Sequence, residues 1–358
     1  MNTFNEELNI SIKKNFPNNY QDNVLQIRFK KKKFKVWLLE ILSDFTYRIG
    51  LFNLILKRKK ILIDSFHYLY DRLSDDYSRE LLIQVLTFRL LGSRKVKLPL
   101  NDGNYFKRIE DIEKSVANKD DFLSPNFLDW KLFLFDLEQY GYKGKAYSIS
   151  PSIFSSFVQP QYQYNGTLIA AKPGDVVIDA GACWGETAMY FAERVKENGK
   201  VYSFEFLPEN LEVMRKNLSL NPEYAKQITM VEKPVWSKSN EPITCNNLGP
   251  GNKVITGVDE ASTTYHTISI DDFAEQNTLE NVNFIKMDIE GSELEALKGA
   301  ENVIKKFRPV LSICVYHKPS DCKHIPAYIE SLNLGYKFYF DHYSIYGEES
   351  VLFAKVEN

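Results

Sequence analysis

VVIDAGACWGETAMYFAERV, residues 176–195, is the stretch that decides the fold of this chain. A short apolar run reaches Asp179, the chain turns through Gly181 and Gly185, and an amphipathic helix follows at once. A buried strand, a glycine turn and a helix open a strand–helix–strand unit, in which the helix N-terminus faces the ligand. The stretch therefore predicts a parallel sheet with a ligand site beyond the end of this strand.

The same rhythm repeats over the rest of residues 165–358. Apolar, β-branched or aromatic runs begin at 200, 228, 282, 310, 335 and 350, and helices fit at 186–197, 208–220, 292–306 and 323–332. Continuous apolar strands separated by helices are typical of a parallel sheet that is covered on both faces. The last two runs leave no room for a helix between them, so they should pair antiparallel at one edge. The predicted fold class is α/β: a doubly wound, mostly parallel, seven-stranded Rossmann-like sheet with an N-terminal mainly helical region.

Other segments break this rhythm. Residues 1–60 are basic and amphipathic, with eleven Lys or Arg but only Glu40 and Asp44 as acids between Arg28 and Lys60. Such a segment can touch an anionic membrane surface or be a solvated face. Residues 61–164 form a second predicted region, mainly helical, that contributes to a substrate site or an oligomer contact. Within it, 61–92 reads as helix with a break at Asp75–Asp76 and a stop at Gly92, and 93–126 as loop. Residues 236–264 read as an irregular functional insertion.

Composition excludes several classes of protein. The chain has 358 residues, a formal net charge of -2 and four cysteines without a C-x-x-C pair. Global charge therefore does not attract nucleic acid, and the cysteines suit a reducing cytoplasm. The N-terminus lacks the apolar block of a signal peptide, and the apolar stretch 34–56 carries charges that a membrane span avoids. A cytoplasmic protein is the prediction.

The turn and the next strand together indicate the ligand. The second strand ends on Glu205, whose carboxylate can accept both hydroxyls of a ribose. Dinucleotide sites need G-x-G-x-x-G, but Cys183 replaces the middle glycine here, and Glu186 in the first helical turn opposes a pyrophosphate. A cofactor without phosphate and with a cationic centre fits better, and S-adenosylmethionine is such a cofactor. Asp179 can counter its cationic end, and the backbone amides after Gly181 can take its carboxylate.

Two long segments carry a family resemblance. VVIDAGACWGETAMYFAERVKENGKVYSFEFLPENLEVMRKNLSLNP (176–222) and VNFIKMDIEGSELEALKGAENVIKKFRPVLSICVYHKP (282–319) resemble FkbM-type S-adenosylmethionine-dependent methyltransferases over roughly residues 165–356. The resemblance implies a class I methyltransferase fold with S-adenosyl-L-methionine as cofactor. Such proteins often read G-A-N-x-G and F-E-P, where this chain has Cys183-Trp184 and Phe206-Leu207-Pro208. The implied cofactor-binding residues are Asp179, Gly181, Ala182, Trp184, Gly185, Glu186, Thr187, Glu205, Phe206, Asn210 and Val235.

The second segment predicts the catalytic groups. Asp288 ends the fourth strand and Tyr316-His317-Lys318 follows the fifth, and neighbouring strands would bring Asp288 within a few ångströms of His317. His317 can act as a general base that the carboxylate orients, or both can hold a divalent metal such as Mg²⁺ or Mn²⁺ that acidifies a hydroxyl. Lys318 can meet a phosphate of the substrate.

Nearby groups have less specific readings. Ser292 and Glu295 fit a capping box, and Glu290 and Glu293 fit charges that favour a helix N-terminus. The Tyr and Gln side chains of 159–164 suit either a sugar site or a domain interface.

The leading function is O-methylation of a sugar hydroxyl, on a free sugar, a nucleotide-linked sugar or a surface-glycan precursor, because FkbM-type proteins mostly act on small molecules and glycans. A nicotinamide-dependent dehydrogenase and a non-catalytic binding module are the alternatives. No N-P-P-Y-like tetrapeptide occurs, so a nucleic-acid partner is not expected. Peripheral membrane contact and a homo-oligomer stay open.

Overall fold

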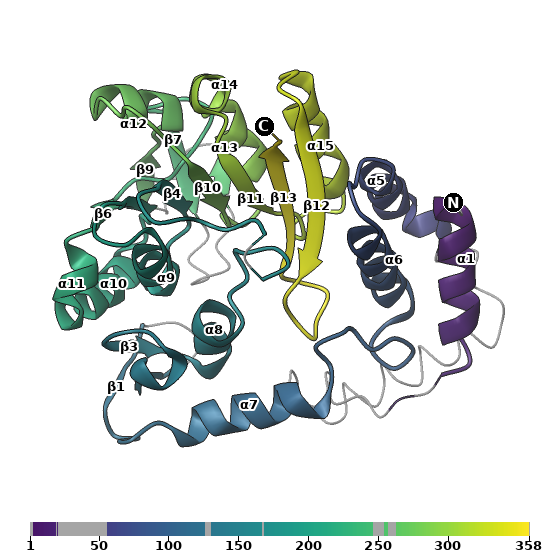
Figure 1. The fold of residues 1–358 in the computed structure, drawn as a ribbon, viewed down its shortest axis with the longest axis horizontal. Helices are drawn as coiled ribbons and strands as arrows, with labels where there is room; N and C mark the ends of the chain where they lie inside the picture. The colour runs from purple at the N-terminus through teal and green to yellow at the C-terminus, as the bar shows by residue number, and fades with distance from the viewer. Residues whose placement is uncertain are drawn as a thin grey trace.

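A seven-stranded sheet forms the centre of the molecule (Figure 1). The structure is a computed structural model and describes residues 3–18, 20, 56–125, 130–166, 168–245, 254–256 and 263–357. Most of the basic segment predicted at 1–60 lies outside these residues. The strand order is β12-β13-β11-β10-β4-β5-β6. The strands are β4 (Val176–Ala180), β5 (Lys200–Phe204), β6 (Ile228–Val231), β10 (Phe284–Met287), β11 (Val310–Cys314), β12 (Tyr336–His342) and β13 (Ser350–Val356).

This sheet confirms the predicted topology. β6, β5, β4, β10 and β11 pair in parallel, whereas β13 runs antiparallel to both β11 and β12. Adjacent residues along β4 serve opposite faces, because Val177 packs in one apolar cluster and Ile178 in the other. Both faces of the sheet are therefore buried, and this explains why its strands are continuous apolar runs in the sequence.

Helices cover the two faces. On one face lie α9 (Glu186–Val195), α10 (Pro208–Leu220) and α11 (Pro222–Ala225), and on the other α12 (Ile270–Gln276), α13 (Glu293–Lys298), α14 (Glu301–Phe307) and α15 (Asp321–Ser331). The helix predicted at 292–306 is wrong as a single helix, since it breaks between α13 and α14. The chain turns at Gly299 and Ala300 between the two helices, and Gly299 fits closely there, because a Cβ atom would lie 2.1 Å from the carbonyl oxygen of Trp236.

The N-terminal helices pack beside β12, the edge strand of the main sheet. α5 (Lys60–Tyr70) packs against α15, α6 (Asp76–Leu91) against β12, and α1 (Phe4–Asn15) against α6 (Figure 1). The predicted break and stop are confirmed, because Asp75 caps α6 by accepting from the Ser78 amide at 2.8 Å and Gly92 ends it with φ 84°.

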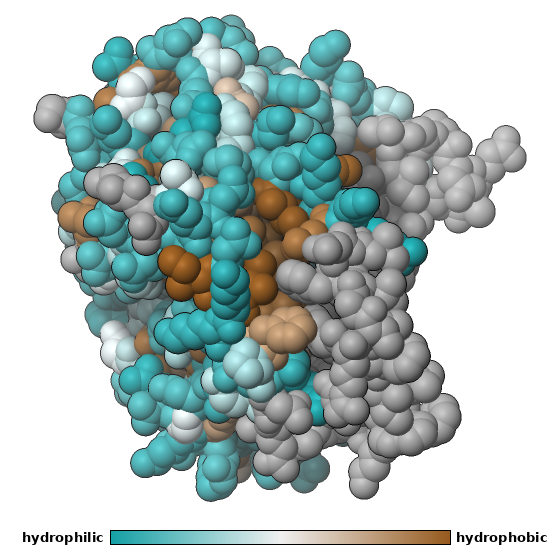
Figure 2. Space-filling view, turned by 90° about the vertical axis from the view of Figure 1, so that its right-hand side faces the viewer, coloured by the Kyte–Doolittle hydropathy of each residue, from teal (hydrophilic) through white to brown (hydrophobic). Residues whose placement is uncertain are grey.

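Figure 2 shows the face of the molecule that carries these helices, and the described part of it is mostly hydrophilic, with an apolar area near its centre. Among the described helices, none is long and apolar enough to cross a lipid bilayer.

Residues 93–126 are not the loop that their polarity suggests. α7 (Gly103–Lys114) lies here. Its apolar residues Tyr105, Ile109 and Ile112 recur at helical spacing among many polar residues, and the loop prediction overlooked that pattern. It is followed by a three-stranded antiparallel sheet, β1-β2-β3, which carries the chain toward the main sheet. The remaining elements of this part are β1 (Phe122–Leu123), β2 (Leu132–Asp136), η1 (Glu138–Tyr140), β3 (Lys145–Ser148), α8 (Ser150–Ile153) and the π-helical turn η2 (Phe154–Val158).

The insertion predicted at 236–264 as irregular also contains strands. β7 (Pro242–Cys245), β8 (Val254–Thr256) and β9 (Thr264–His266) form a small sheet of order β8-β7-β9. Strands of three or four residues are too short to show a period-2 pattern, which explains the difference from the prediction.

Candidate active site

Two pockets open side by side beyond the carboxyl ends of β4 and β10. With the solvent-open space at their mouths included, the first spans about 620 Å³ and the second about 1210 Å³. Both are lined by Gly181 and Cys183 of the glycine turn and by Asp288 and Glu290 after β10. The two pockets therefore meet at the place where an open α/β sheet binds its ligands.

The turn between β4 and α9 is closely fitted to its neighbours. Gly181 has φ 86°, and a Cβ atom there would lie 2.0 Å from the carbonyl oxygen of Asp288. Gly185 has φ 90° and abuts Met214, and Cys183 adopts a left-handed φ of 48° although it is not glycine. Both predicted glycines are thus required by the backbone, one by close approach and both by positive φ.

Glu205 forms one wall of the first pocket. Its Oε1 atom accepts from the amides of Phe206 at 2.7 Å and Leu207 at 2.9 Å, and its Oε2 atom accepts from Asn210 at 3.2 Å. Burial raises the pKa of Glu205, and these donors oppose the rise. Val235 lines the same pocket. Five predicted cofactor residues share this pocket: Gly181, Glu205, Phe206, Asn210 and Val235.

Asp179 does not face either pocket. Its Oδ2 atom accepts from the Thr187 hydroxyl at 2.9 Å, and its Oδ1 atom lies 3.1 Å from the Lys286 ammonium, with both ions buried. The expectation that Asp179 meets a cationic ligand is therefore corrected, because Lys286 takes that place. Lys286 also donates to the carbonyl of Gly181 at 2.7 Å and so holds the glycine turn. A lysine inside the apolar run FIKM was the signal that sequence reasoning missed.

Glu186 lines the second pocket in the first turn of α9. Ser148 at the end of β3 donates to its Oε1 atom at 2.5 Å. Burial raises the pKa of Glu186 to about 7. Ala182, Trp184 and Thr187, also predicted for the cofactor, line this pocket as well.

The rest of the second pocket is aromatic and acidic. Lys286 is the only cationic side chain among its described lining residues. Gln161 and Tyr162, from the Tyr and Gln side chains of 159–164, line this pocket. Tyr164 does not, because its hydroxyl donates to Oδ2 of Asp75 at 2.5 Å. The aromatic residues are Tyr105, Phe154, Tyr162, Trp184, Tyr316, Tyr343 and Tyr346, and the acids are Glu186, Asp288, Glu290 and Glu349.

Asp288 is anchored from both sides. Tyr162 donates to its Oδ2 atom at 2.9 Å and Tyr316 to its Oδ1 atom at 3.0 Å. Burial acts to raise the pKa of Asp288, but the charges of Lys286 and His317 and the two hydroxyls outweigh it and lower that pKa. Asp288 is therefore an ionised and weakly basic group that fixes two tyrosines.

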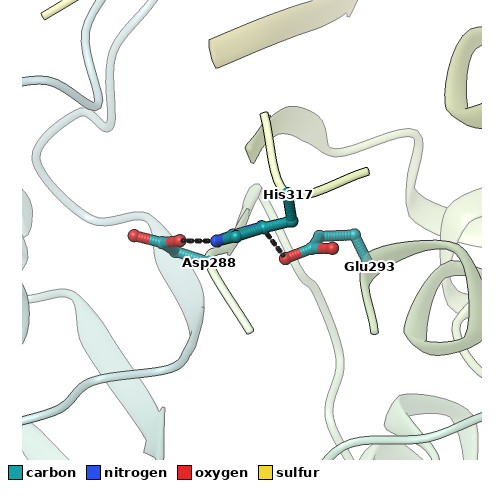
Figure 3. Close-up of side chains that lie close together, drawn as sticks. All are labelled: Asp288, Glu293 and His317. Atoms are coloured by element: carbon teal, nitrogen blue, oxygen red, sulfur yellow. Dashed lines mark ion pairs between the residues drawn. The ribbon is translucent and has the colours of Figure 1, made fainter. Parts of the chain in front are cut away.

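His317 lies within a few ångströms of Asp288, as the strand order predicts, but its surroundings contradict a base role. Figure 3 shows its ring between two carboxylates, with Nδ1 3.0 Å from Glu293 and Nε2 3.5 Å from Asp288. Glu290 also lies 3.5 Å from Nε2. Burial acts to lower the pKa of His317, yet these carboxylates raise it to about 9. The ring is thus an imidazolium at neutral pH and has no free site for a proton.

The same geometry limits which of these groups one metal ion could bind. Ligand atoms of Asp288, Glu293 and His317 lie within 4.8 Å of one another, and their types suit divalent ions. The two carboxylates, however, face opposite nitrogens of the ring (Figure 3). One ion binds one ring nitrogen, so it cannot take all three groups in this arrangement. An ion between Asp288 and Nε2 would therefore leave Glu293 out, and the predicted pair of Asp288 and His317 stays a prediction.

Lys318 and the start of α13 also differ from expectation. The Lys318 ammonium donates to the carbonyl of Gly291 and lines neither pocket, so the predicted contact with a substrate phosphate is not supported. Ser292 makes no side-chain cap bond. Glu293 is the structural acid instead, because it accepts from the amides of Ile289 at 2.9 Å and Gly291 at 3.3 Å.

Comparison with known proteins finds similarity to methyltransferases. Residues 169–338 match the methyltransferase FkbM domain. The fold resembles the crystal structure of a methyltransferase FkbM from Methylobacillus flagellatus KT, with 22% identity and a TM-score of 0.52, over 82% of this chain and 58% of that one. A curated relative, named an uncharacterized RNA methyltransferase of Lactococcus lactis, is 31% identical over 146 residues. That match covers 40% of this chain and 28% of the relative.

Proposed function

This chain belongs to the FkbM methyltransferase family over residues 169–338, and from that premise we propose that it transfers the methyl group of S-adenosylmethionine to a sugar hydroxyl. The observation that carries the proposal is the pair of pockets that meet at Gly181 and Asp288. A methyl transfer needs a donor and an acceptor in contact, and two adjoining pockets supply one place for each.

The first pocket suits the nucleoside end of the donor. The Glu205 carboxylate would accept the ribose hydroxyls, and Phe206 and Val235 would flank the base. Glu186 lies at the start of α9, where a dinucleotide would need to place its pyrophosphate. A carboxylate there opposes the nicotinamide alternative and favours a donor without phosphates.

The second pocket suits a neutral polyol. Aromatic faces and tyrosine hydroxyls supply apolar contact and hydrogen bonds of the kind that sugars use. The ionised Asp288 lies in its wall, and Lys286, the only cation among the described lining residues, is already paired with Asp179, so this pocket does not favour a polyanion such as RNA. For the same reason, the phosphates of a nucleotide-linked sugar would lie outside the pocket.

The chemistry asks little of the protein beyond positioning. The sulfonium supplies an activated methyl group, which the acceptor oxygen displaces in line. Holding the reacting atoms in a near-attack geometry can contribute about 7–11 kcal/mol. The anchored Asp288, with Tyr162 and Tyr316 bonded to it, forms a rigid wall where the two pockets meet.

Calorimetry with S-adenosylhomocysteine tests the donor site. The wild type is expected to bind, and Glu205→Ala to bind roughly 10- to 100-fold more weakly, because a charged acceptor of hydrogen bonds is lost. Glu209→Ala, in the first turn of α10, is the matched control. No binding by the wild type, or equal binding by Glu205→Ala, would reject the assignment.

Transfer from radiolabelled S-adenosylmethionine tests the acceptor. UDP-glucose, UDP-galactose, GDP-mannose and their free sugars form one panel, and total RNA forms the other. Label in a sugar supports the proposal, and label in RNA alone would replace it with the activity named for the Lactococcus lactis relative.

A further inference from the structure

Glu349 is a strained residue in the wall of the second pocket. It lies in the turn between β12 and β13, at φ 68°, a left-handed conformation that disfavours any residue with a Cβ atom. The amide of Tyr343 holds its carbonyl at 3.0 Å. Such strain persists where the surrounding structure fixes it, and it clusters at functional sites.

Its carboxylate has weaker hydrogen-bond donors than Asp288. Gln161 donates to Oε2 at 3.2 Å, and the Tyr316 hydroxyl, whose proton goes to Asp288, lies 3.5 Å from Oε1, whereas Asp288 accepts two hydroxyls at 2.9 and 3.0 Å. A carboxylate with weak donors and anionic neighbours holds a proton more tightly. The titratable groups that face Glu349 are Asp288 and Glu290 after β10, Cys314, Tyr316 and His317 at the end of β11, and Tyr162 before β4.

We propose that Glu349 is the general base of the transfer, an inference that rests on the proposed function. The acceptor O–H bond breaks as its proton passes to the Glu349 carboxylate, and the oxygen forms a bond to the methyl carbon. The carbon–sulfur bond breaks with its electron pair on sulfur, which leaves neutral S-adenosylhomocysteine. No further reactant is needed.

The other acids and the histidine are poorer candidates. His317 has a carboxylate at each of its two ring nitrogens, so neither nitrogen is open to an acceptor hydroxyl, and Asp288 is held ionised by two hydroxyls and two cations. Burial, and next the charge of Asp288, raise the pKa of Glu349 to about 8, whereas the pKa of Asp288 is lowered. A base works best when its pKa lies near the working pH, and Glu349 meets that condition.

Thermal unfolding across pH tests this inference without an acceptor. A carboxyl group with a raised pKa costs native stability as pH rises from about 4.5, where the unfolded chain ionises, to about 8. Glu349→Gln removes that cost. Its Tm, relative to that of the wild type, should therefore rise by at least about 3 °C from pH 5 to pH 9 and level off above pH 8. Glu348→Gln, the adjacent control, should show no such trend.

Kinetics with whichever panel sugar accepts the methyl group completes the test. Glu349→Gln should lower kcat by about 100-fold or more while S-adenosylhomocysteine affinity changes less than about 2-fold, and Glu349→Asp should recover part of the rate. A kcat within 3-fold of the wild type, or a Tm difference that ignores pH, would overturn the inference. If no sugar is methylated, the proposed function fails for that panel, and the thermal measurement alone decides whether Glu349 holds a proton.

Discussion

The ammonium of Lys286 lies 3.1 Å from Oδ1 of Asp179, in an ion pair that is almost completely buried. Lys286 comes from β10 and Asp179 from β4, and the ammonium also donates to the carbonyls of Ala180 and Gly181. One cation thus joins two central strands to the turn that both pockets share.

The first prediction concerns this pair. Lys286→Met should destabilise the protein by about 3–5 kcal/mol, because it leaves the Asp179 carboxylate buried without its counter-charge. Urea unfolding measures the loss. The double variant Lys286→Met/Asp179→Asn should recover a large part of it, since the uncompensated charge is then gone. A single variant within 1 kcal/mol of the wild type would contradict this account.

The second prediction concerns Glu186. Burial raises its pKa to about 7, above the value of about 4.5 in an unfolded chain, so the native state binds its proton more tightly. Stability from this group is complete below pH 4.5 and is lost as pH rises to 7, by about 3 kcal/mol in all. Glu186→Gln should show a smaller loss of Tm between pH 5 and pH 7.5, and the exposed Glu212→Gln should behave as the wild type.

The third prediction concerns the carboxylates around His317. Removing the Glu293 charge should lower the pKa of His317 from about 9, because that carboxylate is the group closest to the ring. Histidine signals in NMR spectra measure the pKa, and His317→Asn assigns the resonance. The raised pKa stabilises the fold fully below pH 6.5, and that contribution is lost as pH rises through 9. Glu293→Gln should flatten this loss.

Glu295→Gln is the control for that experiment, since it changes a more exposed acid of the same short helix. An unchanged pKa of His317 in Glu293→Gln would mean that Asp288 and Glu290 hold the imidazolium without it.

The main sheet could be predicted from sequence because its strands are buried on both faces. Runs such as VVIDA and VLSIC are continuous and apolar, and the residues that end them fall at one edge of a parallel sheet. That rule alone brings Asp288 near His317. α7 was missed although its sequence carries a helix signal, because Asp102 precedes it as an N-cap and Tyr105, Ile109 and Ile112 lie at helical spacing within a polar stretch.

The protonation states could not be predicted from sequence. The role of His317 depends on which acids face its two ring nitrogens. Glu293 comes close to Nδ1 because α13 begins at that residue. Glu349 lines the pocket because its backbone adopts a left-handed conformation, and no local sequence motif predicts that conformation. Charge states in a buried cluster follow from distances across several elements, and spacing along the chain does not encode them.

The last prediction concerns Asn217 of α10. Its Oδ1 atom accepts from the Tyr147 amide at 2.7 Å, and its Nδ2 atom donates to the carbonyls of Tyr147 at 3.0 Å and Trp184 at 2.9 Å. This one amide therefore docks the edge of β3 and fixes the turn before α9. β3 ends on Ser148, the donor to Glu186, so the contact reaches the second pocket.

Asn217→Ala should cost about 2–4 kcal/mol in urea unfolding, because three buried backbone groups lose their partner at once. Asn217→Asp should be at least as harmful, since it keeps the acceptor for Tyr147 but turns a carboxylate toward two carbonyl oxygens. Binding of S-adenosylhomocysteine should weaken in both variants, whereas Ser219→Ala, on the exposed side of α10, should change neither property. Wild-type affinity in a destabilised Asn217→Ala protein would show that β3 supports the fold without shaping the pocket.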